Sequence, residues 1–328
     1  MNREHYPLIS ISIPVYNEEK NILTLYERLT NLARKMKDRC RIEFVFSDNH
    51  SQDKTWQILT NLAKKDKNIK AIRFSKNFGF QRSILANYIH TKGDAVMQID
   101  ADLQDPPEML EDFYALWQKG YKVVYGIRTT RQEGIFITFL RKAAYRIINF
   151  LSEHYIPYDA GDFRLIDRQI IDILKQYKTH DLYIRGLIAE MGFKQTGITY
   201  TRSPRLAGKS KFNFITLITF TFSAIFNHSS VPLRIASISG VIILGISFFG
   251  SLYYLVLKII NPNLPEGLAS IHILLLFAIG FHSLLLGIIG EYILRIYHIL
   301  RAEPVAIIEQ KINIETDNLS EINERGNQ

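Results

Sequence analysis

The chain of 328 residues contains a single cysteine, Cys40, and only two tryptophans. One cysteine excludes an intramolecular disulfide framework and any metal site built from paired cysteines. The chain also lacks the P-loop, the Gly-x-Gly-x-x-Gly dinucleotide motif, the His-Glu-x-x-His zinc motif and the Gly-x-Ser-x-Gly nucleophile elbow. These absences argue against the enzyme classes that depend on those motifs. No long apolar stretch follows a basic start, so we expect no signal peptide and a cytosolic-side protein.

Charged residues make up 22% of the chain and hydrophobic residues 47%, proportions that exclude a disordered or collagen-like chain. The length is sufficient for one large domain or two smaller ones. The net charge of +8 is concentrated in two basic stretches, residues 128–146 and residues 202–211. Such clusters bind nucleic acids, anionic membranes or phosphate ligands, so they do not by themselves identify the partner.

Two stretches in the C-terminal part, residues 235–257 and residues 268–290, contain no Asp, Glu, Lys or Arg. As a helix each would extend roughly 35 Å, enough for the ~30 Å hydrocarbon core of a bilayer. The alternative is a pair of buried core helices, but neither stretch has a polar face to turn toward water. Arg234 precedes the first stretch and Arg295 follows the second, so the positive-inside rule predicts a hairpin with both termini cytoplasmic.

Two further stretches, residues 135–151 and residues 212–226, combine large apolar side chains with basic residues in or beside them. We expect both to be helices at the bilayer surface, with packing against a soluble core as the alternative. The end of the chain is polar and acidic, and we expect poor order from about Asn313 onward. The predicted parts are an α/β domain over 1–211, a juxtamembrane interfacial helix over 212–230, a transmembrane hairpin over 231–292 and a cytoplasmic C-terminal tail over 293–328.

The first part of the chain alternates strand and helix patterns. Strands are predicted over 8–15, 42–46, 69–74 and 95–100, and helices over 18–37, 55–66 and 77–90. This alternation predicts an α/β fold with a mainly parallel sheet and helices on both faces. In such sheets ligands bind beyond the carboxyl ends of the strands. The polar residues that follow those ends are Tyr16, Asn17, Glu18, Asp48, Asp100 and Asp102.

Asp100 and Asp102 follow the fourth strand two residues apart, so both carboxylates can approach one hard cation, and Gln104 can add an amide oxygen. Mg²⁺ or Mn²⁺ takes few protein carboxylates and completes its coordination with water and diphosphate oxygens. Such a metal neutralises the charge that develops on a leaving nucleoside diphosphate. An EF-hand is excluded because Asp105 stands where that loop needs glycine, which leaves an acidic surface turn as the alternative.

Together these residues resemble the family 2 glycosyltransferases, which have the Rossmann-like GT-A fold. More closely, the chain resembles the polyisoprenyl-phosphate glycosyltransferases, which include dolichol-phosphate mannose synthases and bactoprenol glucosyltransferases. The two-span hairpin is similar to the glucosyltransferase branch, and Ser47 departs from the aspartate that many members have before Asp48. The motifs that carry the resemblance lie at residues 13–19, 47–53, 75–79, 100–108, 161–165 and 208–211.

The resemblance implies a metal-dependent enzyme that moves one hexose to a membrane polyprenyl phosphate and inverts the anomeric configuration. Asp100, Asp102 and Gln104 would hold Mg²⁺ or Mn²⁺ against the donor diphosphate. For two of the donor-binding residues a structural role is the alternative, Glu18 as an acid near a helix start and Asn77 as a helix cap. The residues implied to bind the nucleotide sugar are Pro14, Tyr16, Asn17, Glu18, Asp48, Asn77, Arg202 and Lys209.

The acceptor phosphate determines what chemistry such a site must supply. With a second pKa of about 6 it is largely a dianion at neutral pH and needs no general base. Because two anionic substrates repel each other, we expect arginines to bind the acceptor phosphate, with headgroup attraction as the alternative. The resemblance implies an acceptor-side carboxylate at Asp159 or Asp162, which we expect to orient the sugar or Arg164. The arginines expected at the acceptor phosphate are Arg128, Arg131 and Arg141.

The resemblance favours glucose from UDP-glucose as the donor. Mannosyl transfer from GDP-mannose, amino-arabinosyl transfer and a non-catalytic, membrane-anchored nucleotide-sugar-binding protein remain the alternatives. The expected partners are the nucleotide sugar, the polyprenyl phosphate and the bilayer, with no nucleic acid. Small residues four apart in the predicted spans, such as Ala236 and Gly240, would allow a homo-oligomer.

Overall fold

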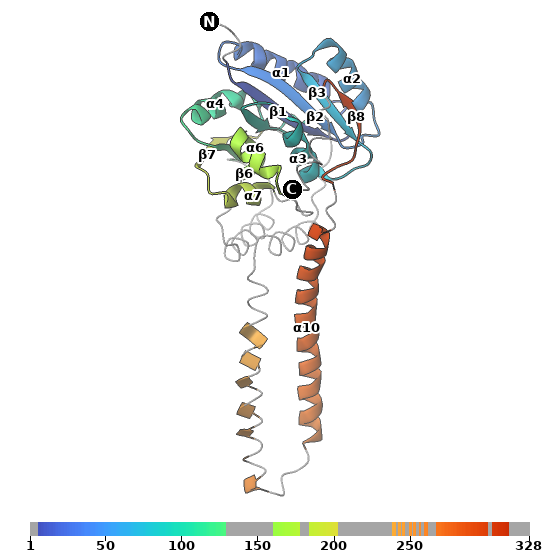
Figure 1. Ribbon diagram of the computed structural model, residues 1–328, viewed down its shortest axis with the longest axis vertical. Helices are drawn as coiled ribbons and strands as arrows, with labels where there is room; N and C mark the ends of the chain where they lie inside the picture. Colours follow the sequence, from blue (N-terminus) through green and yellow to red (C-terminus); the bar gives the residue numbers. More distant parts are fainter. Residues whose placement is uncertain are drawn as a thin grey trace, which may run out of the picture.

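The computed structural model of the chain describes residues 6–128, 160–177, 184–202, 267–300 and 304–314, together with scattered positions from 238 to 261. These residues form an 8-stranded sheet in the order β7-β5-β6-β4-β1-β2-β3-β8. The long helix α10 extends away from the domain that contains this sheet (Figure 1). The α/β class and the mainly parallel sheet predicted from the sequence are therefore confirmed.

The parallel half of the sheet consists of β1 (Leu8–Val15), β2 (Arg41–Asp48), β3 (Ile69–Phe74) and β4 (Ala95–Gln98). These strands alternate with α1 (Ile22–Lys35), α2 (Thr55–Lys65) and α3 (Phe80–His90). Two of the helices begin later than the sequence predicted. Before α3 the reason is Gly79, whose φ of 90° is a left-handed conformation that glycine adopts without strain.

The sheet has a hydrophobic core on each face, because consecutive strand residues point to opposite sides. Leu165 belongs to the cluster beneath α1 and α2, whereas its neighbour Ile166 belongs to the cluster beneath α3. The first cluster also receives Phe113 from α4 (Leu110–Gln118), which follows the short 3-10 helix η2 (Pro107–Met109). The two cores hold the strands in place, and the strands in turn position the loops that follow them.

The other half of the sheet is mixed. In it, β6 (Ala160–Asp167) runs antiparallel to β4 and to β5 (Val123–Arg128), and β7 (Gln195–Tyr200) runs parallel to β5. Two short helices, α6 (Arg168–Leu174) and α7 (Ile184–Glu190), cover the same face as α3. Antiparallel β6 brings its N-terminal end to the edge where the parallel strands have their carboxyl ends.

The last strand, β8 (Ile308–Ile312), pairs antiparallel with β3 at the edge of the sheet. It lies in the segment 293–328 that was predicted as a C-terminal tail, and it ends just before Asn313, where poor order was expected to begin. Asn313 is also described, and its side-chain nitrogen donates to Ala63 O at 2.8 Å and to Ile69 O at 2.9 Å. A short polar edge strand is difficult to predict from the sequence, because it has little hydrophobic pattern of its own. Its stability comes from pairing with a strand that is distant in the sequence.

Helix α10 (Leu268–Leu300) begins where the second uncharged stretch begins and continues beyond its end. No helix in the described part of the chain is long and apolar enough to cross a membrane. The two stretches expected at the bilayer surface, residues 135–151 and residues 212–226, lie outside the described residues. Of the first expected span, residues 235–257, about half is described, at scattered positions.

Candidate active site

Hydrogen bonds join the loops that follow β1 and β2 at the carboxyl edge of the sheet. Asn17, with a φ of 57°, donates its backbone N–H to Ser51 Oγ at 2.9 Å and accepts from Gln52 N at 2.8 Å. The backbone N–H of Glu18 donates to Thr55 Oγ1 at 2.8 Å. The loop that carries Tyr16, Asn17 and Glu18 and the loop that follows Asp48 therefore form one connected structure.

The residues predicted on the first loop differ in accessibility. Pro14 is buried in β1, whereas Tyr16 is 36% exposed at the sheet edge. Glu18 precedes α1 and accepts a hydrogen bond of 2.6 Å from Asn21 Nδ2. Its carboxylate thus stabilises the entry to the helix, which is close to the structural alternative considered for it. Tyr16 presents the largest exposed surface of the three.

Asn77 lies on the loop before α3. Its Oδ1 accepts from Gly79 N at 2.9 Å, which is a local turn of the kind that asparagine commonly stabilises. The neighbouring Phe78 N donates to Asn49 Oδ1 at 2.8 Å and so ties this loop to the end of β2. Asn77 is not the helix cap considered for it, because Gly79 is the N-cap of α3 and no side chain caps that helix. A role of Asn77 in binding the donor stays a prediction.

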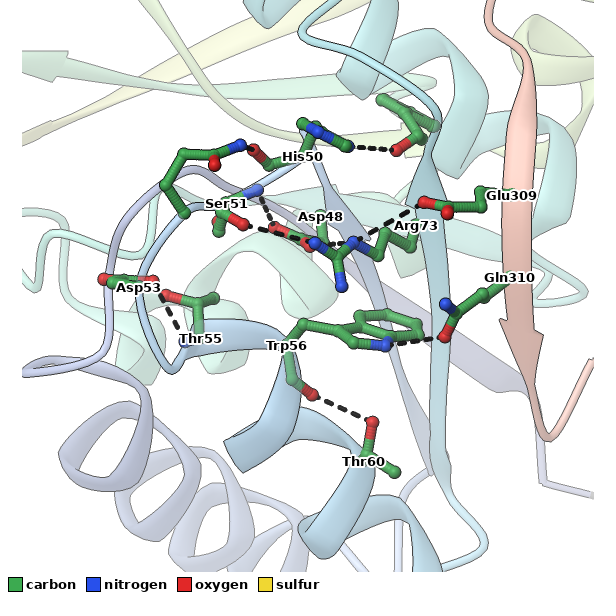
Figure 2. Close-up of polar contacts among 12 residues, drawn as sticks. Asp48, His50, Ser51, Asp53, Thr55, Trp56, Thr60, Arg73, Glu309 and Gln310 are labelled. Carbon is green, nitrogen blue, oxygen red and sulfur yellow. Dashed lines mark hydrogen bonds and ion pairs between the residues drawn. The ribbon is translucent and has the colours of Figure 1, made fainter.

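Asp48 is fully buried at the end of β2. Its Oδ1 accepts from Ser51 N at 3.0 Å, and its Oδ2 lies 3.5 Å from Arg73 Nε (Figure 2). Burial raises the pKa of this carboxyl, while the hydrogen bonds from Ser51 and the charge of Arg73 act in the opposite direction. Asp48 thus holds the backbone of the loop after β2 through its bond to Ser51. Nothing in the sequence indicated that Arg73 would be its partner.

Asp100 and Asp102 follow β4, as the sequence predicted. Between Asp102 and Gln104 the chain turns through Leu103, whose φ of 61° is unusual for a bulky residue, and Gln104 N donates to Asp102 Oδ1 at 3.2 Å. Burial, together with the nearby carboxylates of Asp105 and Asp102, raises the pKa of Asp100 to about 7. The turn therefore concentrates negative charge at the edge of the sheet.

Asp105 is buried and contacts the end of β5 and the end of β7 with the residues that follow it. Its Oδ1 accepts from Tyr200 Oη at 2.5 Å and from Arg202 Nε at 3.1 Å, and Arg128 Nη2 lies 3.5 Å from its Oδ2. Arg202 Nη2 also lies 3.8 Å from Asp102 Oδ2. The structure thus brings together two arginines that the sequence analysis assigned to different substrates. No role was predicted for Asp105 from the sequence, although this residue lies within the motif at residues 100–108.

Asp162 and Arg164 lie on β6, and their predicted role on the acceptor side stays a prediction. Arg185 of α7 donates to both oxygens of Asp162, at 2.8 Å and 2.6 Å. Burial favours the neutral form of this carboxyl, but the charges of Arg185 and Arg164 outweigh it and hold the pKa of Asp162 below its usual range. Arg164 Nη2 donates to Gly161 O at 2.7 Å. No sequence motif pointed to Arg185.

Among the described residues, no group of three or more His, Cys, Asp or Glu side chains forms a metal site. The donor set after β4 nevertheless fits a cation that shares its coordination with a diphosphate, since Mg²⁺ uses only one or two protein carboxylates in such sites. Mutual repulsion of Asp100, Asp102 and Asp105 in a buried position is the condition that a divalent cation relieves. Asp100, Asp102 and Gln104 are therefore suited to hold it.

Four residues of the predicted site lie outside the described residues. They belong to the expected acceptor and diphosphate contacts, and their roles stay predictions. The four are Arg131, Arg141, Asp159 and Lys209.

The structure is an α/β fold that brings acidic and basic groups together at the carboxyl edge of its sheet. Residues 10–174 match the family model described as Glycosyl transferase family 2. The chain belongs to this family of glycosyltransferases.

The similar proteins extend the likeness beyond the matched domain. The uncharacterized glycosyltransferase YkcC of Bacillus subtilis is 37% identical over 94% of this chain and 96% of its own length. The bactoprenol glucosyl transferase of Shigella phage SfX is 32% identical over 92% of this chain and 99% of its own. Among solved structures, the Pyrobaculum calidifontis mannosyltransferase PcManGT is 17% identical over 69% of this chain and 65% of its own, with a TM-score of 0.47.

Proposed function

We propose that the chain transfers one glucose from UDP-glucose to the phosphate of a membrane polyprenyl phosphate, with inversion at the anomeric carbon. The observation that carries this proposal is the meeting of Asp102, Asp105, Arg128 and Arg202 at the carboxyl edge of the sheet. A similar protein named bactoprenol glucosyl transferase, whose length the chain covers almost completely, favours this donor and this acceptor.

Asp100, Asp102 and Gln104 would hold Mg²⁺ or Mn²⁺, which when bound neutralises charge on the departing nucleoside diphosphate. Arg202 lies close enough to Asp102 to act on the same diphosphate, and Arg128 approaches Asp105 from the other strand. Preorganised guanidinium groups lower the repulsion between the donor and an acceptor phosphate that must come within about 3–3.5 Å of the reacting carbon. The acceptor oxygen attacks as an anion, so the protein removes no proton from it.

The position of Asp162 supports an orienting role for its carboxylate. Arg185 occupies both carboxylate oxygens and stabilises the charged form, which makes the group a weak base. In this proposal the ion pair fixes the acceptor side of the site next to Arg164. Arg131, Arg141 and Lys209 are proposed to complete the phosphate contacts, and Asp159 remains the second candidate for the orienting carboxylate.

The membrane part of the proposal is a hairpin over residues 231–292 with the catalytic domain and both termini on the cytoplasmic side. Its support is that β8 returns to the catalytic sheet after α10, so the chain enters and leaves this segment on the same side. Large apolar side chains on α10 also lack cover, such as Leu274 at 73% exposure and Leu286 at 68%. An acceptor whose tail is dissolved in the bilayer would bring its phosphate to the cytoplasmic surface of the membrane, on the side of the catalytic domain.

The test uses the purified full-length chain with labelled UDP-glucose or GDP-mannose and a short polyprenyl phosphate. Labelled polyprenyl-phosphate glucose with a β linkage is the expected product. A mannosylated lipid would correct the donor, an α linkage would refute inversion, and nucleotide-sugar binding without any transfer would favour a non-catalytic protein. Parallel reactions with and without Mg²⁺ or Mn²⁺ test the metal.

A further inference from the structure

The edge strand β8 reaches the predicted nucleotide site from the far end of the chain. Trp56 Nε1 on α2 donates to Gln310 Oε1 at 2.8 Å, although 254 positions separate the two residues. Figure 2 shows the side chains of Glu309 and Gln310 on the same side of β8, directed toward Arg73 and Trp56. The segment that follows α10 is therefore in direct contact with the elements that carry the loop after β2.

Arg73 connects this strand to the buried Asp48. Its Nε lies 3.5 Å from Asp48 Oδ2 and 3.8 Å from Glu309 Oε2, and its Nη2 donates to Ser51 O at 3.3 Å. The guanidinium also lies over the ring of Trp56, 5.8 Å from the centroid. One cation thus contacts the carboxylate, the backbone of the loop and the tryptophan, and β8 contacts the cation and the tryptophan.

An irregularity in the pairing of β3 with β8 explains how two consecutive residues reach this cluster. Arg73 is opposite Gln310 and Phe74 is opposite Ile308, so Glu309 is an extra residue on β8. In a regular strand Glu309 and Gln310 would point to opposite faces of the sheet. A β-bulge redirects one side chain, and bulges are frequent beside functional sites.

The contacts continue from this cluster to the loop after β1. Asp48 holds Ser51 N, and Ser51 Oγ in turn accepts from Asn17 N. Two further bonds join the same loops, from Glu19 N to Asp53 Oδ2 at 3.2 Å and from Lys54 N to Glu19 Oε2 at 3.0 Å. A displacement of Arg73 would therefore alter the positions of both loops of the predicted nucleoside site.

We propose that β8 is a positioning element of the donor site, in which Glu309 and Gln310 hold Arg73 and Trp56 in the places that order the loop from Asp48 to Thr55. The ligand whose affinity this controls is a nucleoside diphosphate. The inference rests on the proposed function only in taking that loop as part of the nucleotide site. It makes binding of the water-soluble donor dependent on the chain that emerges from α10.

The test measures the affinity of the full-length protein for UDP by calorimetry, with GDP as the second probe, for Glu309→Ala and Gln310→Ala. Each variant removes an exposed side chain, and we expect the Kd for UDP to rise about twofold to fivefold. Arg73→Gln removes the cation itself and should raise the Kd about tenfold or more. Lys311→Ala, an exposed change on the same strand, is the matched control and should leave the Kd unchanged.

Two further measurements distinguish a positioning role of β8 in the donor site from a general effect on stability. With donor and lipid acceptor present, Glu309→Ala should raise the KM for the nucleotide sugar while kcat stays within about twofold, because β8 does not touch the reacting groups. Glu309→Asp keeps the charge and should recover part of the affinity. General destabilisation would instead lower the fraction of active enzyme and therefore the apparent kcat.

The two proposals fail in different ways. If Glu309→Ala and Gln310→Ala bind UDP as tightly as Lys311→Ala does, β8 is not a positioning element. If the unsubstituted protein binds UDP but loads no sugar onto the lipid, the proposed function fails, and the UDP affinities still decide the role of β8. If the unsubstituted protein binds neither nucleoside diphosphate, both proposals are wrong.

Discussion

Arg185 binds both carboxylate oxygens of Asp162, at 2.8 Å and 2.6 Å, across the gap between α7 and β6. The pair is mostly buried, and a bidentate contact of this kind fixes the orientation of a carboxylate as well as its charge. Asp162 is consequently ionised at every pH where the enzyme is expected to work. A carboxylate in this state can orient a neighbour but accepts a proton poorly.

The first prediction concerns the pH profile of Asp162→Asn. We expect kcat to fall by about tenfold to a hundredfold, because Arg185 loses its charged partner and the acceptor side loosens. The rise of activity through about pH 6 should persist in the variant, since it reports ionisation of the acceptor phosphate. Steady-state rates from pH 5 to pH 9 measure both quantities. Loss of that rise would identify Asp162 as a general base.

The second prediction concerns the proposed metal ligands. Asp100→Asn and Asp102→Asn should each lower kcat by about a hundredfold to a thousandfold, because a divalent cation contributes several kcal/mol of charge stabilisation. A chelator should abolish transfer by the unsubstituted protein, and Mg²⁺ or Mn²⁺ should restore it. Asp38→Asn, an exposed change far along the chain, serves as the control. Full activity of both Asp100→Asn and Asp102→Asn would show that these residues do not hold a metal needed for catalysis.

The third prediction concerns Asp105→Asn. Asp105 is 1% exposed and faces Arg128 and Arg202, so neutralising it removes a buried counter-charge that both arginines share. We expect a loss of about 3 kcal/mol in the free energy of unfolding, together with a higher KM for the donor. Chemical denaturation of the full-length protein and donor titrations measure the two effects. Stability and KM both equal to the unsubstituted values would show that Asp105 does not organise the arginines.

The fourth prediction is a pH dependence of stability through Asp167. This carboxylate begins α6 by accepting from Gln169 N at 3.0 Å, and it also accepts from Trp117 Nε1 at 2.8 Å. Burial alone would raise the pKa of Asp167, but these bonds and Lys122 lower it below its usual range. The stabilisation is therefore complete above the unfolded pKa of about 3.9 and is lost as the pH falls through the lower folded value.

Asp167→Asn should accordingly destabilise the protein by about 2 kcal/mol at pH 7. The difference from the unsubstituted protein should shrink below about pH 4. Thermal unfolding of both proteins across this range, with Asp38→Asn as the control, measures the effect. A difference that does not change with pH would show that the charge of Asp167 contributes nothing.

The fifth prediction concerns the attachment of the C-terminal strand. Asn313, with a φ of 55°, donates to the carbonyl oxygens of Ala63 and Ile69 and so fastens the end of β8 to α2 and β3. Asn313→Ala removes both bonds and places alanine in a left-handed conformation. We expect a loss of about 2 kcal/mol and faster proteolysis after α10. Unchanged protection of the C-terminal segment would contradict the pairing described.

Much of the parallel half of the sheet could be predicted from the sequence. Strands β1 and β3 have the predicted bounds, because buried parallel strands are runs of apolar residues that local pattern identifies. The position of Asp100 and Asp102 at the end of a strand could be predicted for the same reason, since they follow such a run. Arg73, Arg185 and the role of Asp105 could not be found, because each depends on strands or helices that meet only after folding.

The sequence by itself determined which chemical groups stand at the ends of the parallel strands, because alternation of strand and helix forces those ends to one edge. The tertiary structure alone decided which of these groups act on one another. It paired Asp162 with Arg185, gathered Arg128 and Arg202 around Asp105, and brought β8 beside β3. The physical reason is that burial makes an isolated charge costly, so each charged group takes the partner that the packing of distant elements supplies.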